Sequence, residues 1–231
     1  MEPVQSTRSR RVCRGIVLLA AVLGCSPQRQ AAGPHDATVR HSFEDVTHWI
    51  AVFDDPARDA WQKPQDVVHT LAIRSGMCVV DLGAGTGYFS RYLSTAVGDG
   101  GSVLAVDTEP SLVVHLRERA DNEGLRNVIP VLASPDNPRL PVAAADLILI
   151  VDTVHHIDDR IEYFRRLKRF LKPEGRVAVI DFKKQPLPVG PPVEHKLAPE
   201  AVVEEFHASG YVLVAEPDLL PYQYVLVFRP Q

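Results

Sequence analysis

The segment VVDLGAGTGYFS (residues 79–90) constrains the fold more than any other part of the chain. An apolar β-type run leads into three glycines at every second position, Gly83, Gly85 and Gly87, and then into a helix start. Glycine lacks a Cβ and lets a ligand approach the backbone closely, so this order of elements predicts a nucleotide-binding strand–turn–helix unit. The spacing of the glycines must then decide which nucleotide the turn holds.

The rest of the chain repeats this rhythm of strand-like and helix-like segments. Five apolar β-type runs occur: MCVVDLG (77–83), SVLAVD (102–107), NVIPVLA (127–133), DLILIVD (146–152) and RVAVIDF (176–182). Their near-continuous hydrophobicity predicts strands that are buried on both faces. Helix-length segments or turn residues such as GDGG (98–101) and KPEG (172–175) separate them, which predicts an α/β domain with a mostly parallel sheet.

Two further strand-like runs end the chain, after a helix-like segment over residues 198–210. YVLVAEPDLL (211–220) and QYVLVFRP (223–230) are separated only by Pro221 and Tyr222. Parallel neighbours need a crossover of about a dozen residues or more, so this pair predicts an antiparallel hairpin.

Length and composition fit one globular α/β domain with accessory segments. The chain has 231 residues, 45% of them hydrophobic, and a formal net charge of −4. No sustained basic run follows the N-terminus, so the sequence shows no footprint for nucleic acid.

The first forty residues have the pattern of an export signal. Four arginines within residues 8–14 precede the apolar run GIVLLAAVLG (15–24), which is too short to span a bilayer. The following VLGC (22–25) resembles the lipobox of bacterial lipoproteins, and SRRVCR (9–14) faintly resembles a twin-arginine signal. We therefore expect residues 1–24 to be a signal peptide and Cys25 to be lipidated, which would attach the protein to a membrane of the bacterial cell envelope. An uncleaved anchor or an incorrect start codon are the alternatives.

The charge and the cysteine content agree with cleavage of a signal peptide before Cys25. Cleavage before Cys25 would leave 21 basic against 28 acidic residues, and Cys78 as the one unmodified thiol, which cannot form an internal disulfide. Residues 25–41 are polar with proline, glycine and alanine, and predict a flexible tether. The folded part is expected over 42–231, with helices over 42–75 before a core over 76–231.

The glycine spacing departs from that of dinucleotide-binding folds, which use G-x-G-x-x-G around a pyrophosphate. Here the three glycines alternate with single residues, and the carboxylate of Asp107 follows Gly85 by 22 residues. This loop, this acid, the strand rhythm and the C-terminal hairpin together resemble the class I S-adenosylmethionine-dependent methyltransferases. The resemblance covers residues 61–228. It implies a Rossmann-like three-layer sandwich with a mostly parallel seven-stranded sheet and an antiparallel C-terminal hairpin strand.

The resemblance implies S-adenosylmethionine as the cofactor and assigns residues to it. Asp81 and the backbone of Gly83, Gly85 and Gly87 would hold the methionine end, including its ammonium. Asp107 would bind the ribose, because an ionised carboxylate suits two hydrogen bonds from a cis-diol. Thr108 belongs to the same expected site. Asp81 could instead cap a helix or close a turn.

Many relatives place an acid near the adenine after the third strand. In this chain Ser134 aligns with that position, so Ser134 is included in the expected cofactor site. Asp136 is the alternative adenine contact.

The segment IVDTVHHIDD (150–159) resembles the wall where acceptors approach in small-molecule methyltransferases. It lacks the Asn-Pro-Pro-aromatic pattern of amide and nucleobase methylases. We expect Asp152 to contact the cofactor, and His155 or His156 to take a proton from an acceptor hydroxyl or thiol, since imidazole titrates near neutral pH. Alternatively, one of the two histidines packs against the next helix.

Methyl transfer from a sulfonium disperses charge, so it depends mainly on alignment and exclusion of water, and no catalytic residue is obligatory. In the family, segments such as residues 53–64 form a lid over the site. Arg58, Trp61 and Gln62 are the lid residues expected at the acceptor, although Trp61 could equally anchor its helix to the core.

No metal site is expected. His155 and His156 are adjacent and point in different directions, and the sequence has no Cys-x-x-Cys or His-Glu-x-x-His spacing. The acids Asp152, Asp158 and Asp159 could bind a divalent ion, but solvated loop acids are the commoner case.

Two other classes of function compete with a methyltransferase acting on a small molecule. A non-catalytic envelope lipoprotein could retain a nucleoside-binding fold, because S-adenosylmethionine is made in the cytoplasm and an exported enzyme would lack an evident donor supply. The intact glycine loop and both acids argue against this, and a cytoplasmic location would remove the conflict. An NAD-dependent oxidoreductase is disfavoured by the glycine spacing and the hairpin.

Overall fold

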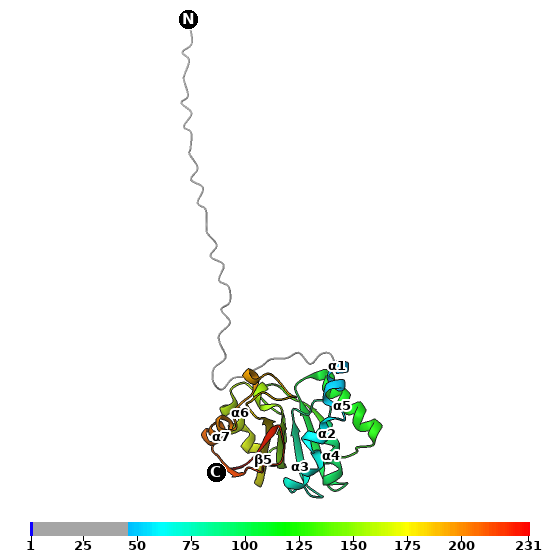
Figure 1. The fold of residues 1–231 in the computed structure, drawn as a ribbon. Coiled ribbons are helices and arrows are strands. Elements are labelled where there is room, and N and C mark those ends of the chain that lie inside the picture. The colour runs from blue at the N-terminus through cyan, green and yellow to red at the C-terminus, as the bar shows by residue number, and fades with distance from the viewer. Residues whose placement is uncertain (2–45) are drawn as a thin grey trace. The chain divides into compact units, whose positions relative to one another are not determined.

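The computed structural model describes Met1 and residues 46–231, and the intervening residues are drawn as a grey trace in Figure 1. The expected signal peptide, the tether and Cys25 therefore lie outside the described residues, apart from Met1. Residues 46–231 form a central sheet with helices on both sides (Figure 1). Among the described residues, no helix is long and apolar enough to cross a membrane.

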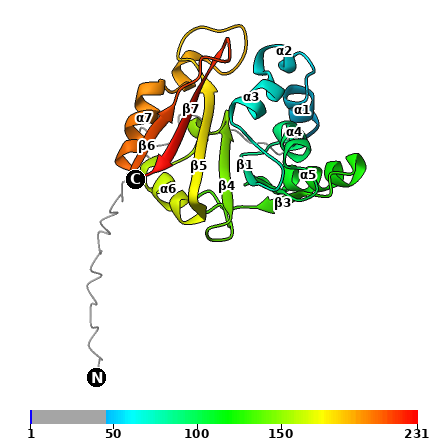
Figure 2. The same ribbon diagram turned by 90° about the horizontal axis from the view of Figure 1, so that it is seen from below.

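The sheet has seven strands in the order β3-β2-β1-β4-β5-β7-β6, which Figure 2 shows side by side. Their bounds are β1 (Cys78–Leu82), β2 (Ser102–Asp107), β3 (Val128–Leu132), β4 (Ala145–Val151), β5 (Leu171–Phe182), β6 (Tyr211–Ala215) and β7 (Gln223–Pro230). The pairs among β1 to β5 are parallel, whereas β7 runs antiparallel to both β5 and β6. This confirms the predicted mostly parallel sheet with an antiparallel C-terminal strand.

The helices lie between these strands and before the first of them. They are α1 (Val46–Phe53), α2 (Arg58–Gln62), α3 (Pro64–Thr70), α4 (Tyr88–Val97), α5 (Pro110–Glu123), α6 (Arg160–Leu167), α7 (Pro199–Ala208) and the short 3-10 helices η1 (Val154–His156), η2 (Lys168–Phe170) and η3 (Val193–His195). Proline begins α3, α5 and α7, at a position where its missing N–H leaves no helical hydrogen bond unmade.

The central strands supply two hydrophobic cores, because successive side chains point to opposite faces of the sheet. On β4, Ile148 and Ile150 pack in the core under α6 and α7, whereas Leu147 and Leu149 pack in the core under α3, α4 and α5. Because both faces of β4 are buried, this strand needs apolar residues at every position.

The prediction of burial on both faces is wrong for β3, where Ile129 and Leu132 are 48% and 40% exposed. This strand lies at the sheet edge, and the connection from β3 to β4 contains no helix.

Two segments differ from their predictions. KPEG (172–175) was expected as a turn but lies inside β5, where the register with β4 shifts between Ala145 and Leu147. Pro173 has no N–H to donate to a ladder, which accounts for an irregularity there. The expected strand over 211–220 ends at Ala215, and Pro217 and Pro221 occupy the connection to β7.

Candidate active site

A cavity of about 650 Å³ opens at the carboxyl ends of β1, β2 and β4. Parallel strands end at the same edge of a sheet, so the residues that follow them come together there. Eleven residues singled out from the sequence line this cavity: Arg58, Trp61, Asp81, Gly83, Gly85, Asp107, Thr108, Asp152, His155, His156 and Asp158. Gln62, Gly87, Ser134 and Asp136 do not line it.

The three glycines of the turn after β1 all have positive φ, at +79°, +57° and +87°, a region that side chains rarely adopt. A Cβ on Gly83 would lie 2.3 Å from Thr153 Oγ1, and one on Gly87 would lie 2.7 Å from Leu116 Cδ2. The missing Cβ at Gly83 and Gly87 therefore leaves room for the side chains of Thr153 and Leu116 to pack against the turn. At Gly85 a Cβ would lie 3.4 Å from the ring of Phe53, which itself lines the cavity, so Gly85 borders the space open to a ligand.

Asp81 lies at the end of β1 and is 2% exposed. The Ser90 hydroxyl donates a hydrogen bond to its Oδ2 at 2.6 Å. Burial raises the pKa of Asp81 to about 6, although this hydrogen bond opposes the shift. The backbone of Ser90, in the first turn of α4, also hydrogen-bonds to Asp81, so the alternative role as a residue that caps this helix stays open.

Asp107 ends β2 and is tied to the glycine turn. Its Oδ2 accepts the Gly85 N–H at 2.8 Å, and its Oδ1 accepts the Glu109 N–H at 3.0 Å. Burial raises the pKa of this carboxyl, while the backbone N–H groups of Glu109 and Gly85 partly offset the shift. The two carboxylates at the ends of β1 and β2 are thus both held in place beside the turn.

The segment after β3 contributes Ala133 and Pro135 to the cavity. Ser134 lies between them, and its backbone N–H and C=O pair with Asn137 at 3.0 Å. The Ser134 hydroxyl reaches the Asn137 carbonyl at 3.4 Å. The described hydrogen bonds of Ser134 are thus all made within its own loop. The expected contact of Ser134 with the adenine stays a prediction, and so does the alternative contact of Asp136, which is exposed.

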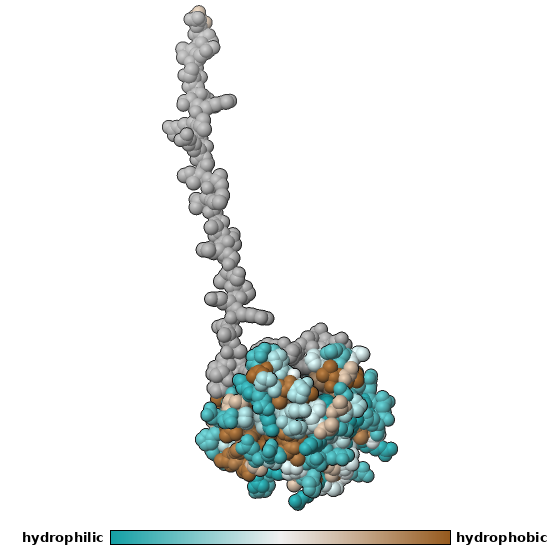
Figure 3. All heavy atoms as spheres, viewed as in Figure 1, coloured by the Kyte–Doolittle hydropathy of each residue, from teal (hydrophilic) through white to brown (hydrophobic). Residues whose placement is uncertain are grey.

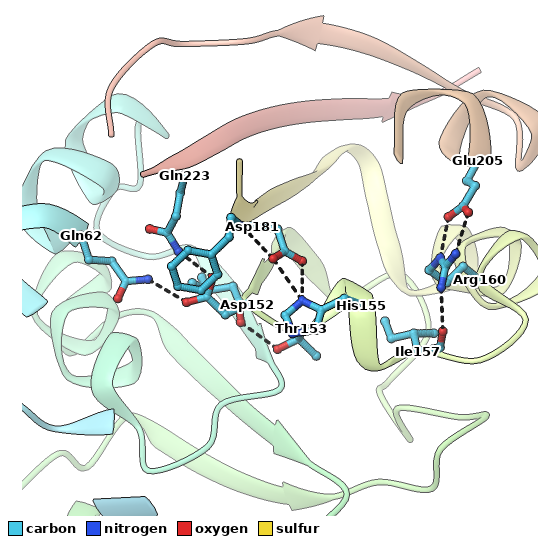
Figure 4. A network of polar contacts seen from close by, with 11 residues as sticks. Gln62, Asp152, Thr153, His155, Ile157, Arg160, Asp181, Glu205 and Gln223 are labelled. Atoms are coloured by element: carbon cyan, nitrogen blue, oxygen red, sulfur yellow. Dashed lines mark hydrogen bonds and ion pairs between the residues drawn. The ribbon is translucent and has the colours of Figure 1, made fainter. Parts of the chain in front are cut away.

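Asp152 follows β4 and is held by two glutamines from distant parts of the chain (Figure 4). The amide Nε2 of Gln223 donates to Oδ1 at 2.6 Å, and that of Gln62 donates to Oδ2 at 3.1 Å. The backbone of Asp152 has a φ of +51°, which is uncommon outside glycine. Its N–H donates to the Ile180 carbonyl at 2.8 Å, so the strained residue is fixed to β5.

His155 and Asp181 form a second buried pair close to Asp152 (Figure 4). His155 Nδ1 lies 2.9 Å from Asp181 Oδ2 and 3.1 Å from Oδ1. The imidazole is 3% exposed and the carboxylate 0% exposed. His156 lies next to it, with the two ring centroids 4.3 Å apart.

The charges of Asp152, His155 and Asp181 change the pKa values of their neighbours in this group. Burial raises the pKa of Asp152 to about 6, and the nearby negative charge of Asp181 adds to the shift. Burial alone would lower the pKa of His155, but the carboxylates of Asp181 and Asp152 outweigh it and raise that pKa above its ordinary value. The pair therefore keeps a proton to higher pH than a free imidazole does.

The segment before the core contacts the glycine turn. Asp54 accepts hydrogen bonds from the Thr86 hydroxyl and from Arg119 of α5, both at 2.9 Å. Trp61 of α2 packs with its ring centroid 5.9 Å from that of Phe182. Figure 3 shows hydrophobic residues in brown where α1 lies in Figure 1, and Val52 of that helix is 45% exposed.

Among the residues that the structure describes, no group of three or more histidine, cysteine, aspartate or glutamate side chains is placed to hold a metal ion.

Residues 79–175 match the family model described as a methyltransferase domain. This part of the chain is similar to methyltransferase domains. The chain is also similar to bacterial relatives named ubiquinone/menaquinone biosynthesis C-methyltransferase UbiE. The Enterobacter sp. protein is 34% identical over 151 residues, which are 63% of this chain and 59% of the relative. The Pseudoalteromonas translucida protein is 30% identical over 149 residues, 61% of this chain and 59% of the relative. The chain thus spans less than two thirds of the length of these relatives.

Solved structures extend the likeness of the methyltransferase domain to almost the whole described fold. An S-adenosylmethionine-dependent methyltransferase from Aquifex aeolicus superimposes with a TM-score of 0.77 and 27% identity, over 82% of this chain and 98% of that one. The predicted class of fold is confirmed, and S-adenosylmethionine is the cofactor of that class. A structure described as the [4+2]-cyclase SpnF, with 18% identity and a TM-score of 0.59, shares the fold alone.

This cavity fits a cofactor that carries positive charge. Asp81, Asp107 and Asp152 all line it, and burial raises the pKa of each. An ionised carboxylate has about four acceptor positions, so Asp81 and Asp107 can each accept further hydrogen bonds from an ammonium or from ribose hydroxyls. A sulfonium and an ammonium would offset these charges, whereas a pyrophosphate would be repelled by them.

Sequence reasoning missed four residues of the candidate site and its surroundings: Arg119, Thr153, Asp181 and Gln223. Asp181 carried a signal, because it is an acid inside the apolar run RVAVIDF. A buried strand keeps a carboxylate only when that carboxylate has a partner. Thr153 lies within the segment 150–159 that the sequence already singled out, whereas Arg119 and Gln223 lie where the sequence pattern is ordinary and reach the site only through the fold.

Proposed function

We propose that this protein transfers the methyl group of S-adenosylmethionine to a small-molecule acceptor bound in the large cavity. The observation that carries the proposal is the arrangement of Asp81 and Asp107 beside the glycine turn, in the same cavity as His155. Carboxylates at the turn favour a cationic nucleoside over a dinucleotide. When bound, the cofactor supplies an electrophilic methyl group on its sulfonium.

The protein's own residues would hold the two ends of the cofactor. Asp81 and the backbone around Gly83 would bind the methionine end, and Asp107 with Thr108 would bind the ribose. The Gly85 N–H already donates to Asp107, which keeps its carboxylate fixed before a ligand arrives. The lid contact of Asp54 with Thr86 would exclude water from this end of the cavity.

We further propose that the acceptor is an aromatic molecule with a ring hydroxyl. The support is the aromatic lining of the cavity, which includes Trp49, Phe53, Trp61 and Phe182. Aromatic pairs add about 0.5–1.5 kcal/mol beyond the burial of area. The relatives named as C-methyltransferases of quinone biosynthesis are consistent with such an acceptor.

His155 is proposed to take the hydroxyl proton of the acceptor. Its Nδ1 is engaged by Asp181, so Nε2 is the nitrogen that would exchange the proton. The deprotonated acceptor would attack the methyl group, and the positive charge formed on His155 would be stabilised by Asp181. For methylation at a ring carbon, the attack leaves a methylated dienone; loss of the ring-carbon proton to water restores the aromatic ring, and His155 returns its proton to the acceptor oxygen. We assign the proton transfer to His155 because the buried carboxylate of Asp181 lies 2.9 Å from its Nδ1.

The proposal is tested by binding and by transfer on the full chain. Calorimetry with S-adenosylhomocysteine, S-adenosylmethionine and NAD should show binding of the first two only. Asp107→Asn should weaken that binding by about 1.5–3 kcal/mol through lost charge-assisted hydrogen bonds, whereas Asp121→Asn on the exposed side of α5 should not.

Binding alone does not establish the reaction, because a cyclase shares this fold. Transfer of the labelled methyl group of S-adenosylmethionine should therefore be followed with quinol, phenol, thiol and amine acceptors. Label on a quinol or phenol supports the full proposal, and label on a thiol or amine alone would correct the acceptor. No binding of S-adenosylhomocysteine at millimolar concentration would contradict the enzyme proposal and favour the non-catalytic alternative.

We also propose that the protein is exported and anchored through a lipid on Cys25. The support lies in the sequence alone, in the apolar run of residues 15–24 and the VLGC that ends in Cys25. Metabolic labelling with palmitate should mark the wild type and not Cys25→Ser. Equal labelling of both proteins, or recovery of both with the first 24 residues intact in the cytoplasm, would contradict it.

A further inference from the structure

Two arginines lie directly opposite each other on neighbouring strands. β5 and β7 pair antiparallel with Val177 opposite Phe228, and the next residues outward in this register are Arg176 and Arg229. Directly opposite residues have Cβ atoms about 4.5–5.5 Å apart, and like charges in such a pair are destabilising. The sequence thus keeps an unfavourable pair at the point where the β5–β7 pairing ends.

Both arginines project to one face of the sheet. Ala178 on β5 and Val227 on β7 belong to the core under α3 and α4. Side chains two residues apart on a strand share a face, so Arg176 and Arg229 lie on this same side. No helix of the described fold packs over β6 on this face, and Val212 and Val214 are 40% and 47% exposed.

A second cavity of about 650 Å³ lies at this position, and no residue lines both it and the active-site cavity. Arg176 and Arg229 line it together with Val214, Pro217 and Val227. One part of the cavity is therefore cationic and another is apolar. Glu216 also lines it, which disfavours a ligand with negative charge at both ends.

The contacts of the two arginines leave their charges largely uncompensated. Arg176 donates to the Leu71 carbonyl at 2.7 Å, and it forms no ion pair among the described residues. Arg229 meets Glu174 at 3.3 Å, but these side chains are 49% and 86% exposed, and ion pairs of this kind contribute little. Burial, and then the positive charges of Arg229 and Arg74, lower the pKa of Arg176.

We propose that this cavity binds an anionic amphiphile, with its phosphate or carboxylate group between Arg176 and Arg229 and its apolar body on Val214, Pro217 and Val227. The planar guanidinium presents several N–H donors in a geometry that matches the oxygens of such groups. The bound anion would also remove the repulsion between the two arginines. This inference concerns a site separate from the methyltransferase cavity and does not rest on the proposed function.

Calorimetry of the full chain with n-hexyl phosphate, n-hexanol and inorganic phosphate tests the proposal. We expect n-hexyl phosphate to bind, inorganic phosphate to bind more weakly, and n-hexanol not to bind. Arg176→Gln and Arg229→Gln should each weaken the binding of n-hexyl phosphate by about tenfold or more. The matched control is Arg165→Gln, since Arg165 lies on α6 beyond the opposite face of the sheet and is 53% exposed.

Stability without a ligand provides a second readout. Arg229→Gln relieves the repulsion, so at low salt its Tm should not fall below that of the wild type, while the Tm gained on adding n-hexyl phosphate should shrink. Equal binding of n-hexyl phosphate by the wild type and both cavity variants would overturn the proposal. An unchanged far-UV circular dichroism spectrum verifies that the variants are folded.

Vesicles distinguish the two sources of such a ligand. Sedimentation with phosphatidylglycerol vesicles, but not with phosphatidylcholine vesicles, that is lost in the double arginine variant would identify a membrane lipid. Binding of n-hexyl phosphate without sedimentation would identify a free organic phosphate or carboxylate. Both results support the site.

Discussion

The imidazole of His155 and the carboxylate of Asp181 form a buried pair that joins η1 to the end of β5. Nδ1 lies 2.9 Å from Oδ2, and the Phe182 N–H donates to Oδ1 of the same carboxylate at 2.8 Å. Because a strand fixes the carboxylate, the carboxylate in turn fixes the orientation and tautomer of the ring. This pair distinguishes His155 from the adjacent His156.

Asp181→Asn should lower kcat by roughly a hundredfold, because the side chain keeps its shape but no longer stabilises a charged imidazole. In the wild type the pKa of His155 is raised, so activity should increase with pH through a value above the ordinary 6.5. Removing the negative charge lowers that pKa and moves the acid limb of the pH–rate profile to lower pH. Steady-state kinetics across pH checks both effects.

The matched control for this change is Asp146→Asn. Asp146 lies at the opposite end of β4, where it accepts the Cys78 N–H at 2.8 Å. Its substitution should leave the pH profile unmoved. An Asp181→Asn protein with a wild-type profile and wild-type kcat would remove His155 from the mechanism.

Binding of S-adenosylhomocysteine should weaken as the pH falls through about 6, where Asp81 takes up a proton. A protonated Asp81 no longer attracts an ammonium, so affinity should fall about tenfold between roughly pH 7 and pH 5. Calorimetry over this range measures the effect. Asp81→Asn should bind weakly at every pH, and a wild-type dependence in that variant would place the titrating group elsewhere.

The raised pKa of Asp81 also makes the stability of the folded protein depend on pH. Its protonated form is favoured in the folded protein, so this contribution is present below the ordinary pKa of 3.8 and is lost as the pH rises through about 6. As the pH rises from acidic to neutral, the urea midpoint of the wild type should therefore fall relative to that of Asp81→Asn.

Gly83→Ala should destabilise the protein by about 2–4 kcal/mol, from a left-handed backbone and from overpacking. The new Cβ would lie 2.3 Å from Thr153 Oγ1. Gly76→Ala is the matched control, since Gly76 has a φ of +87° and no atom within 4 Å of its Cβ position. It should cost about 1–2 kcal/mol. Equal losses in urea unfolding would show that Thr153 yields to the clash.

Asp54→Ala should release the lid from the glycine turn. Asp54 binds both Thr86 and Arg119 at 2.9 Å, so its removal should speed dissociation of S-adenosylhomocysteine several-fold with little loss of stability. Stopped-flow dissociation measures this rate. Glu123→Gln removes the other carboxylate partner of Arg119, at 2.8 Å, and should leave the rate unchanged.

Much of the cavity lining at the glycine turn followed from local sequence. Asp81, Gly83, Gly85 and Asp107 each lie within a few residues of the end of an apolar run, and parallel strands bring such ends to one edge. The acceptor side followed only in part. His155 was identified as a candidate, but its choice over His156 depends on Asp181, which lies 26 residues away.

The sequence by itself determined the seven strands, their mostly parallel arrangement and the glycine turn, because hydrophobic periodicity and turn residues are local properties. The tertiary structure alone decided which side chains meet. Gln62 and Gln223 reach Asp152 from positions 90 and 71 residues away, and Arg119 reaches Asp54 across 65 residues. Such contacts leave no pattern in a single sequence, since a polar side chain there looks the same whether it meets solvent or a partner.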